Sequence, residues 1–132
     1  MYAWAGNRSE PGGFYRVRYT GKPAHQPVTI KTSPETVTIG FTDPLDKASA
    51  GDPASWAIRA WDLKRTSTYG SKHFNEREWK VSKAVLSGDG KSVTLTIPDL
   101  APTWGMSIRM NLRGAAGEDV VREMHNSIFK LE

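Results

Sequence analysis

The sequence predicts an all-β domain, a sandwich of seven or eight short strands with one long basic and aromatic loop. Most of the chain alternates apolar and polar residues with a period of two, the pattern of strands that bury one face and expose the other. Turn residues recur roughly every 8 to 12 residues, which is typical of a sandwich. The 132 residues, 38% of them hydrophobic, suffice for the core of one domain. A closed barrel remains an alternative.

The first half of the chain contains four predicted strands, which are FYRVRY (14–19), PVTIKT (27–32), ETVTIGF (35–41) and SWAIRAWD (55–62). The segment 42–56 is rich in Pro, Ala and Asp and does not alternate. We expect it to cross between the sheets, with one helical turn after Asp43 or Asp46.

The second half begins with the clearest hairpin of the chain. Two alternating runs, 79–86 and 91–98, flank the short link SGDG, which is a typical hairpin connection. A further strand is predicted at 106–112, followed by a turn. The last run, 120–131, fits a helix or a strand, and we favour a strand because the sandwich needs its final edge filled.

The segment 63–78 is unusually long for a hairpin loop and is enriched in Lys, Arg, Tyr and His. Aromatic rings and cations side by side can stack on a sugar or base and contact an anion. The candidate binding residues are Trp61, Lys64, Arg65, Tyr69, Lys72 and His73. The alternative, which we favour, is a solvated loop whose aromatic rings fold over the sandwich edge or dock on a neighbouring domain.

Five tryptophans are too widely spaced for all of them to share one core, so we expect at least one or two to be partly exposed. Exposed tryptophans are the platform with which carbohydrate-binding modules hold a glycan. We favour the alternative, in which Trp56 is the core tryptophan of the sandwich and Trp61, Trp79 and Trp104 cover its rim.

Composition excludes several classes of function. The net charge of +4 is spread along the chain, unlike a nucleic-acid-binding arm, so no nucleic acid partner is predicted. The absence of cysteine excludes disulfides, iron–sulfur clusters and thiol nucleophiles. No run reaches the ~18 apolar residues of a membrane span, and the chain shows no signal peptide.

No pattern predicts catalysis, a cofactor or a metal site. The three histidines, His25, His73 and His125, lack the spacing of metal ligands. Asp43, Asp46 and Asp52 match no calcium loop and are expected to serve as turn and cap residues. Ser71 lies in YGSKH, which lacks the second glycine of a nucleophile elbow. We therefore expect a protein that is not an enzyme.

The ordered series FTDPLD (41–46), SGDGKSVTLTI (87–97) and PDLAP (98–102) resembles a bacterial immunoglobulin-like domain of surface and secreted proteins. A narrower resemblance rests on GGFYRVRYTGKP (12–23), FTDPLD, YGSKH (69–73) and HNSIFKL (125–131). These motifs are similar to the C-terminal segment of planctomycete multidomain proteins, where it follows a β-propeller resembling sugar dehydrogenases. Cytochrome c or haem-binding modules often accompany it.

The resemblance implies that residues 1–22 are the last strand and linker of an upstream propeller, and that residues 23–132 form an immunoglobulin-like β-sandwich. It implies a non-catalytic accessory domain of a larger periplasmic or secreted protein, with upstream domains of the same polypeptide as partners. The chain has no CxxCH motif and no propeller repeats, so neither haem chemistry nor sugar oxidation is expected here.

Two alternative functions stay open. One is a carbohydrate-binding module that uses exposed aromatic rings to bind a polysaccharide. The other is a domain that lends Lys72 and His73 to an active site in the propeller. If the predicted strand 14–19 lacks its propeller, its exposed aromatic residues could also form a dimer.

Overall fold

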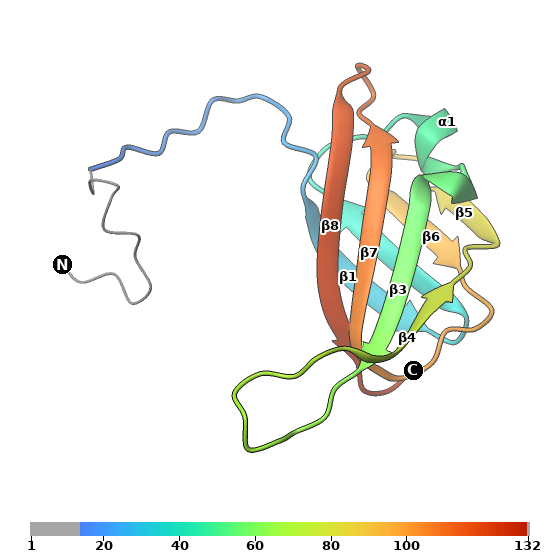
Figure 1. Ribbon diagram of the computed structural model, residues 1–132. Helices are drawn as coiled ribbons and strands as arrows, with labels where there is room; N and C mark the ends of the chain where they lie inside the picture. Colours follow the sequence, from blue (N-terminus) through green and yellow to red (C-terminus); the bar gives the residue numbers. More distant parts are fainter. Residues whose placement is uncertain (1–13, 132) are drawn as a thin grey trace.

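The computed structural model describes residues 14–131, in which eight strands form two antiparallel sheets that face each other (Figure 1). One sheet has the order β1-β2-β6-β5 and the other β4-β3-β7-β8. This is the arrangement of an immunoglobulin-like sandwich, so the predicted fold class is confirmed and the barrel is excluded. The elements are β1 (Pro27–Ser33), β2 (Thr36–Phe41), α1 (Lys47–Ala50), the 3₁₀ helix η1 (Pro53–Ser55), β3 (Trp56–Asp62), β4 (Phe74–Trp79), β5 (Lys83–Leu86), β6 (Ser92–Thr96), β7 (Thr103–Arg113) and β8 (Asp119–Ile128).

The core lies between the two sheets and follows the period-two alternation of the sequence. Most of the large, fully buried side chains come from β2, β6, β7 and β8, and they include Ile39, Leu95, Ile108 and Leu112. Trp56 on β3 belongs to the same cluster and is only 5% exposed. The expectation that Trp56 lies in the core is confirmed, but Trp79, which was expected to cover the rim, belongs to the same core cluster and is 6% exposed.

The connection from β2 to β3 crosses between the sheets, as predicted. It contains α1 and η1, and each begins with an aspartate that caps it: Asp46 accepts a hydrogen bond from the Ser49 amide, and Asp52 from the Ala54 amide. These bonds satisfy amide groups that a helix start leaves unpaired. The predicted cap roles of both aspartates are confirmed.

The predicted hairpin around SGDG is confirmed as the β5–β6 pair, with Leu86 opposite Val93. The final run also forms the predicted strand, β8, at the edge of its sheet. The run 79–86 was wrongly expected to be one strand. Trp79 ends β4 in one sheet, and the chain then crosses to β5 in the other.

The long loop is shorter than predicted, because β4 begins at Phe74 and only residues 63–73 remain outside the strands. Strand β4 pairs with β3 at the edge of the sheet. Its sequence, FNEREW, is mostly polar, so local alternation gave no signal. Pairing with β3 is what makes this segment a strand.

The predicted strand 14–19 is wrong. Residues 14–26 form no strand, and the side chains of Phe14, Tyr15, Val17 and Tyr19 are exposed. A strand needs a neighbour to satisfy its backbone hydrogen bonds, and no strand among residues 14–131 pairs with this segment. A dimer through an N-terminal strand stays a prediction, and residues 1–13, which include Trp4, lie outside the described residues.

The chain joins the sandwich at Ala24–Gln26, a segment that we call the arm clamp. The Asp43 carboxylate accepts hydrogen bonds from the amides of Ala24 and His25 (2.9 Å each) and from the Thr42 hydroxyl (2.6 Å). The His25 ring is 5% exposed, and its Nε2 lies 3.7 Å from a Glu118 oxygen at the β7–β8 turn. The clamp therefore fixes the N-terminal arm, residues 14–23, at that end of the sandwich.

Asp43→Asn is expected to lower stability near neutral pH but to have little effect near pH 2. The hydrogen bonds from Thr42, His25 and Ala24 lower the pKa of Asp43 from 3.8 to about 2. Stability from the ionised carboxylate is fully present above pH 3.8 and is lost as the pH falls through about 2. Thermal unfolding midpoints of the two proteins between pH 7 and pH 2 would check this. A gap of constant size across that range would contradict it.

Candidate functional site

Two β-bulges lie at the end of the β4-β3-β7-β8 sheet where the 63–73 loop emerges. The pairing register shifts between Thr103 and Met106 on β7, and between Ala60 and Asp62 against β4. Asn75, in the second bulge, has a φ of 50°, a left-handed conformation that Asn tolerates better than most residues. Bulges turn side chains in new directions and are common beside functional sites.

Hydrogen bonds hold the bulged backbone in place. The buried Thr103 hydroxyl lies 3.1 Å from the carbonyl oxygen atoms of Trp61 and Gly105, and accepts a bond from Arg77 (3.2 Å). The Ser127 hydroxyl donates to the Trp104 carbonyl (2.6 Å). The backbone around Trp104 is therefore fixed from both neighbouring strands.

An exposed apolar cluster lies at this end of the sheet. Trp104 is 54% exposed and Phe129 is 78% exposed, and their rings meet edge to face with centroids 6.2 Å apart. Leu63, at the start of the loop, is also exposed. We call Leu63, Lys64, Arg65, Trp104 and Phe129 the end patch, because all five line the hollows at this end.

Trp104 lines two neighbouring hollows of about 560 Å³ each. Leu63, Lys64 and Trp104 line both. The first hollow is completed by Arg65, Thr66, Thr68, Gly70 and Ser71, and the second by Asp62, Asn75, Pro102, Thr103, Ile128 and Phe129. The loop and the ends of β3, β7 and β8 thus form one uneven surface around a single tryptophan.

Trp61, a predicted contact residue, is only 8% exposed. Its ring stacks on His73 (centroids 4.1 Å apart, planes 14° apart) and meets His125 edge to face (6.1 Å). Gly105 lies directly beneath it, and a Cβ at that position would overlap the indole. Trp61 therefore holds the C-terminal side of the loop against the sheet and offers no ring to a ligand.

The other predicted residues fall into two groups. Lys64 and Arg65 lie in the end patch, and the Lys64 ammonium also sits 4.5 Å from the centre of the Phe74 ring. Tyr69 and Lys72 are exposed further along the loop. His73 is held by Trp61 and by a 3.0 Å hydrogen bond to Glu76.

From the sequence, Trp104 was expected to cover the rim of the sandwich, and Phe129 was not among the candidate binding residues. Strict alternation puts Trp104 on the same side as Met106, which is fully buried. The bulge between Thr103 and Met106 adds one residue and leaves Trp104 exposed. Phe129 follows directly after the last strand residue, Ile128. Nothing in local alternation marks either residue as a surface group.

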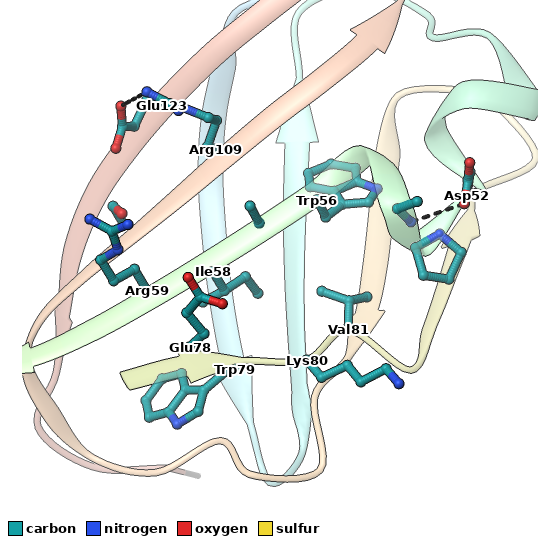
Figure 2. A pocket seen from close by; sticks show the side chains of 14 residues that line it. Asp52, Trp56, Ile58, Arg59, Glu78, Trp79, Lys80, Val81, Arg109 and Glu123 are labelled. Carbon is teal, nitrogen blue, oxygen red and sulfur yellow. Dashed lines mark hydrogen bonds and ion pairs between the residues drawn. The ribbon is translucent and has the colours of Figure 1, made fainter. Parts of the chain in front are cut away.

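A third hollow, of about 810 Å³, is lined by β3, the end of β4 and β7 (Figure 2). Its charged residues are balanced and several are already engaged. Arg109 pairs with Glu123 (3.6 Å), and Asp52 caps η1. The remaining charged lining residues are Arg59, Glu78 and Lys80. This hollow therefore offers neither an exposed aromatic ring nor an excess of one charge.

The described residues hold no group of three or more His, Asp or Glu side chains that could bind a metal. Asp43 was expected to be a turn or cap residue, but it caps no helix within residues 14–131: two of its three hydrogen bonds come from the distant amides of Ala24 and His25 at the arm clamp. Within residues 14–131, no helix has the length and apolar character to span a membrane.

No family model matches the chain, and no curated protein matches it. Among solved structures, the chain is similar to a crystal structure of the S-layer protein SbsC, with a TM-score of 0.57, 20% identity, and coverage of 80% of this chain and 14% of that one. A structure of SbsC domains 1–6 gives a TM-score of 0.55, 21% identity and coverage of 76% and 13%. A crystal structure of the N-terminal part of the bacterial S-layer protein SbsC gives a TM-score of 0.54 and 20% identity. The match covers 76% of this chain and 23% of that one. The chain spans less than a quarter of each, and the likeness shows only that this chain and part of SbsC share a fold.

Proposed function

We propose that this chain is a non-catalytic interaction domain of a larger exported polypeptide, and that the end patch is its binding surface. The observation that carries the proposal is the exposed Trp104 ring, held by Phe129 and lining two neighbouring hollows. Exposed tryptophan is typical of binding surfaces. The two bulges and their hydrogen bonds preorganise this surface.

The ionisable groups beside the end patch support a binding role without catalysis. Asp62 accepts hydrogen bonds from Asn75 and Arg77, and these bonds lower its pKa. It therefore stays ionised and does not act as a general acid near neutral pH. Glu76 is shared between His73 and Arg59. These carboxylates serve the structure of the loop.

The solved structures with a similar fold support the proposal of a larger exported polypeptide. The similar structures are domains of surface-layer proteins, and this chain covers only 13 to 23% of them. A periplasmic or secreted location, the planctomycete architecture and the upstream propeller are part of the proposal. The exposed arm up to residue 23, followed at once by the arm clamp, supports a boundary near residue 22.

The arm clamp and the end patch lie at opposite ends of the sandwich (Figure 1). Strand β7 runs from Thr103, beside the end patch, to Arg113, next to the turn that covers His25. Its 11 residues correspond to roughly 35 Å at about 3.4 Å per residue. We therefore place a preceding domain at the clamp end, which leaves the end patch available to a different partner.

A carbohydrate-binding module is the second candidate, and Trp104 is the observation that favours it. Among the tryptophans within residues 14–131, Trp56, Trp61 and Trp79 are buried and Trp104 is exposed. A glycan would therefore stack on a single ring and not on a planar row. The third role, in which Lys72 and His73 complete an upstream active site, is disfavoured because His73 is already held by Trp61 and Glu76.

The test is a comparison of the unmodified chain with Trp104→Ala. Binding is measured by calorimetry against the adjoining segments of the longer polypeptide and against soluble neutral and acidic polysaccharides. We expect at least one partner to bind, and Trp104→Ala to weaken it about tenfold. Val121→Ala is the matched control, because Val121 is exposed on β8 opposite Asn111, away from the patch. No binding, or binding that Trp104→Ala leaves unchanged, would overturn the proposal.

A further inference from the structure

We propose that the end patch binds an acidic polysaccharide, with a pyranose ring on Trp104 and its carboxylate or sulfate groups on Lys64 and Arg65. This inference rests on the proposed function and names the class of ligand.

The charge of the end patch is positive. Lys64 and Arg65 line the first hollow, and none of the carboxylates within residues 14–131 lines it. Among the same residues, Asp62 is the one carboxylate that lines the second hollow, and Arg77 and Asn75 already hold it. The loop residues 63–73 contain three Lys or Arg residues and no Asp or Glu. An anionic ligand would thus meet cations without facing an unpaired carboxylate in either hollow.

The hydroxyl groups of the first hollow suit a saccharide. Thr66, Thr68 and Ser71 line it together with Trp104. The Thr66 hydroxyl donates to the Thr68 carbonyl (3.2 Å), and the Ser71 hydroxyl accepts from the Lys64 amide and donates to the Lys72 carbonyl. These bonds fix the loop while Thr66 keeps lone pairs for a sugar hydroxyl. Polar groups of this kind orient a sugar stacked on an aromatic ring.

One flat ring distinguishes a saccharide from other anionic partners. The apolar face of a pyranose matches a single exposed indole, and Trp104 supplies it. A single-stranded nucleic acid stacks successive bases on several rings, whereas within residues 14–131 the one ring that meets Trp104 is Phe129, edge to face. Acidic peptides are recognised by a sheet edge, an apolar groove or a cluster of arginines, whereas the first hollow has one arginine, Arg65, and three hydroxyl side chains beside Trp104.

The experiment measures binding to two matched pairs of polymers by affinity electrophoresis and calorimetry at 150 mM salt, roughly physiological ionic strength. Polygalacturonate is compared with its methyl ester, and dextran sulfate with dextran. We expect at least one acidic polymer to bind and its neutral counterpart to bind at least about tenfold more weakly. Two other anionic polymers serve as controls. Polyglutamate contains no sugar, and oligo-dT carries its negative charges on phosphates and not on its sugars.

The variants are Trp104→Ala and the double variant Lys64→Ala with Arg65→Ala, and each should weaken binding about tenfold. The matched control is Lys31→Ala with Lys83→Ala, which removes two exposed cations from β1 and β5 of the other sheet. Circular dichroism spectra that match those of the unmodified chain confirm that the variants fold.

Four results would overturn the inference. The neutral polymer could bind as tightly as its acidic counterpart, or polyglutamate or oligo-dT could bind as tightly as the acidic polysaccharide. The Lys31→Ala, Lys83→Ala control could lose as much affinity as the Lys64→Ala, Arg65→Ala variant, or neither acidic polysaccharide could bind. The last result separates the two proposals. If adjoining segments of the polypeptide or a neutral polysaccharide still bind in a Trp104-dependent way, the proposed function stands and only the acidic ligand is wrong. If nothing binds, both proposals fail.

Discussion

Trp56→Ala is expected to lower the free energy of unfolding by about 3 to 5 kcal/mol, the usual cost of truncating a buried tryptophan to alanine. Trp56 is 5% exposed in the core, and its indole N–H donates to the Ala50 carbonyl (3.2 Å). The side chain thus fills the space between the sheets and also ties the C-terminal end of α1 to β3. Its removal would leave a cavity and an unpaired carbonyl.

Urea denaturation followed by circular dichroism would measure this loss. Trp56→Phe is the informative comparison, because it keeps much of the apolar contact while removing the bond to Ala50. We expect Trp56→Phe to cost about 1 to 3 kcal/mol. Trp104→Ala is the matched control, and its exposed ring should contribute within about 0.5 kcal/mol. A similar loss for Trp56→Ala and Trp104→Ala would contradict the assignment of Trp56 to the core.

Trp61→Ala is expected to lower the free energy of unfolding by about 2 to 3 kcal/mol, less than the ~3 to 5 kcal/mol for a core tryptophan, because Trp61 lies outside the core cluster. It should also weaken ligand binding, although Trp61 is buried. The reason is that His73 stacks on its ring and marks the C-terminal end of the loop. Without the indole, the loop that carries Lys64 and Arg65 loses its attachment to the sheet.

Hydrogen exchange of the amides of residues 63–73 would measure this loosening, and we expect it to be faster in Trp61→Ala. Trp61→Phe keeps a ring for His73 to contact and should restore most of the protection. Gly105→Ala provides an independent check, because the added methyl group would displace the same indole at a cost of about 1 to 3 kcal/mol. Unchanged exchange in Trp61→Ala would show that the loop does not depend on this ring.

The sequence by itself determined the features that depend on neighbouring residues. Alternation identified β1, β2, β3 and β7, the SGDG link identified the β5–β6 hairpin, and Asp46 was one of the two aspartates expected to begin a helical turn. Each signal is local, because strand periodicity, a tight turn and a helix cap are all set within a few residues. The sandwich and its core tryptophan, Trp56, followed from these signals.

The tertiary structure alone decided where the candidate site lies. The segment 14–19 alternates as well as any strand, yet no neighbour pairs with it, whereas the polar segment 74–79 is a strand because β3 lies beside it. A bulge on β7 leaves Trp104 exposed, and Gly105 makes room for Trp61 to be buried. Pairing, register and close approach depend on residues far apart in the chain. The interleaving of aromatic residues and cations therefore included Trp61 among the candidate contacts, whereas the folded sheet buries Trp61 and exposes Trp104.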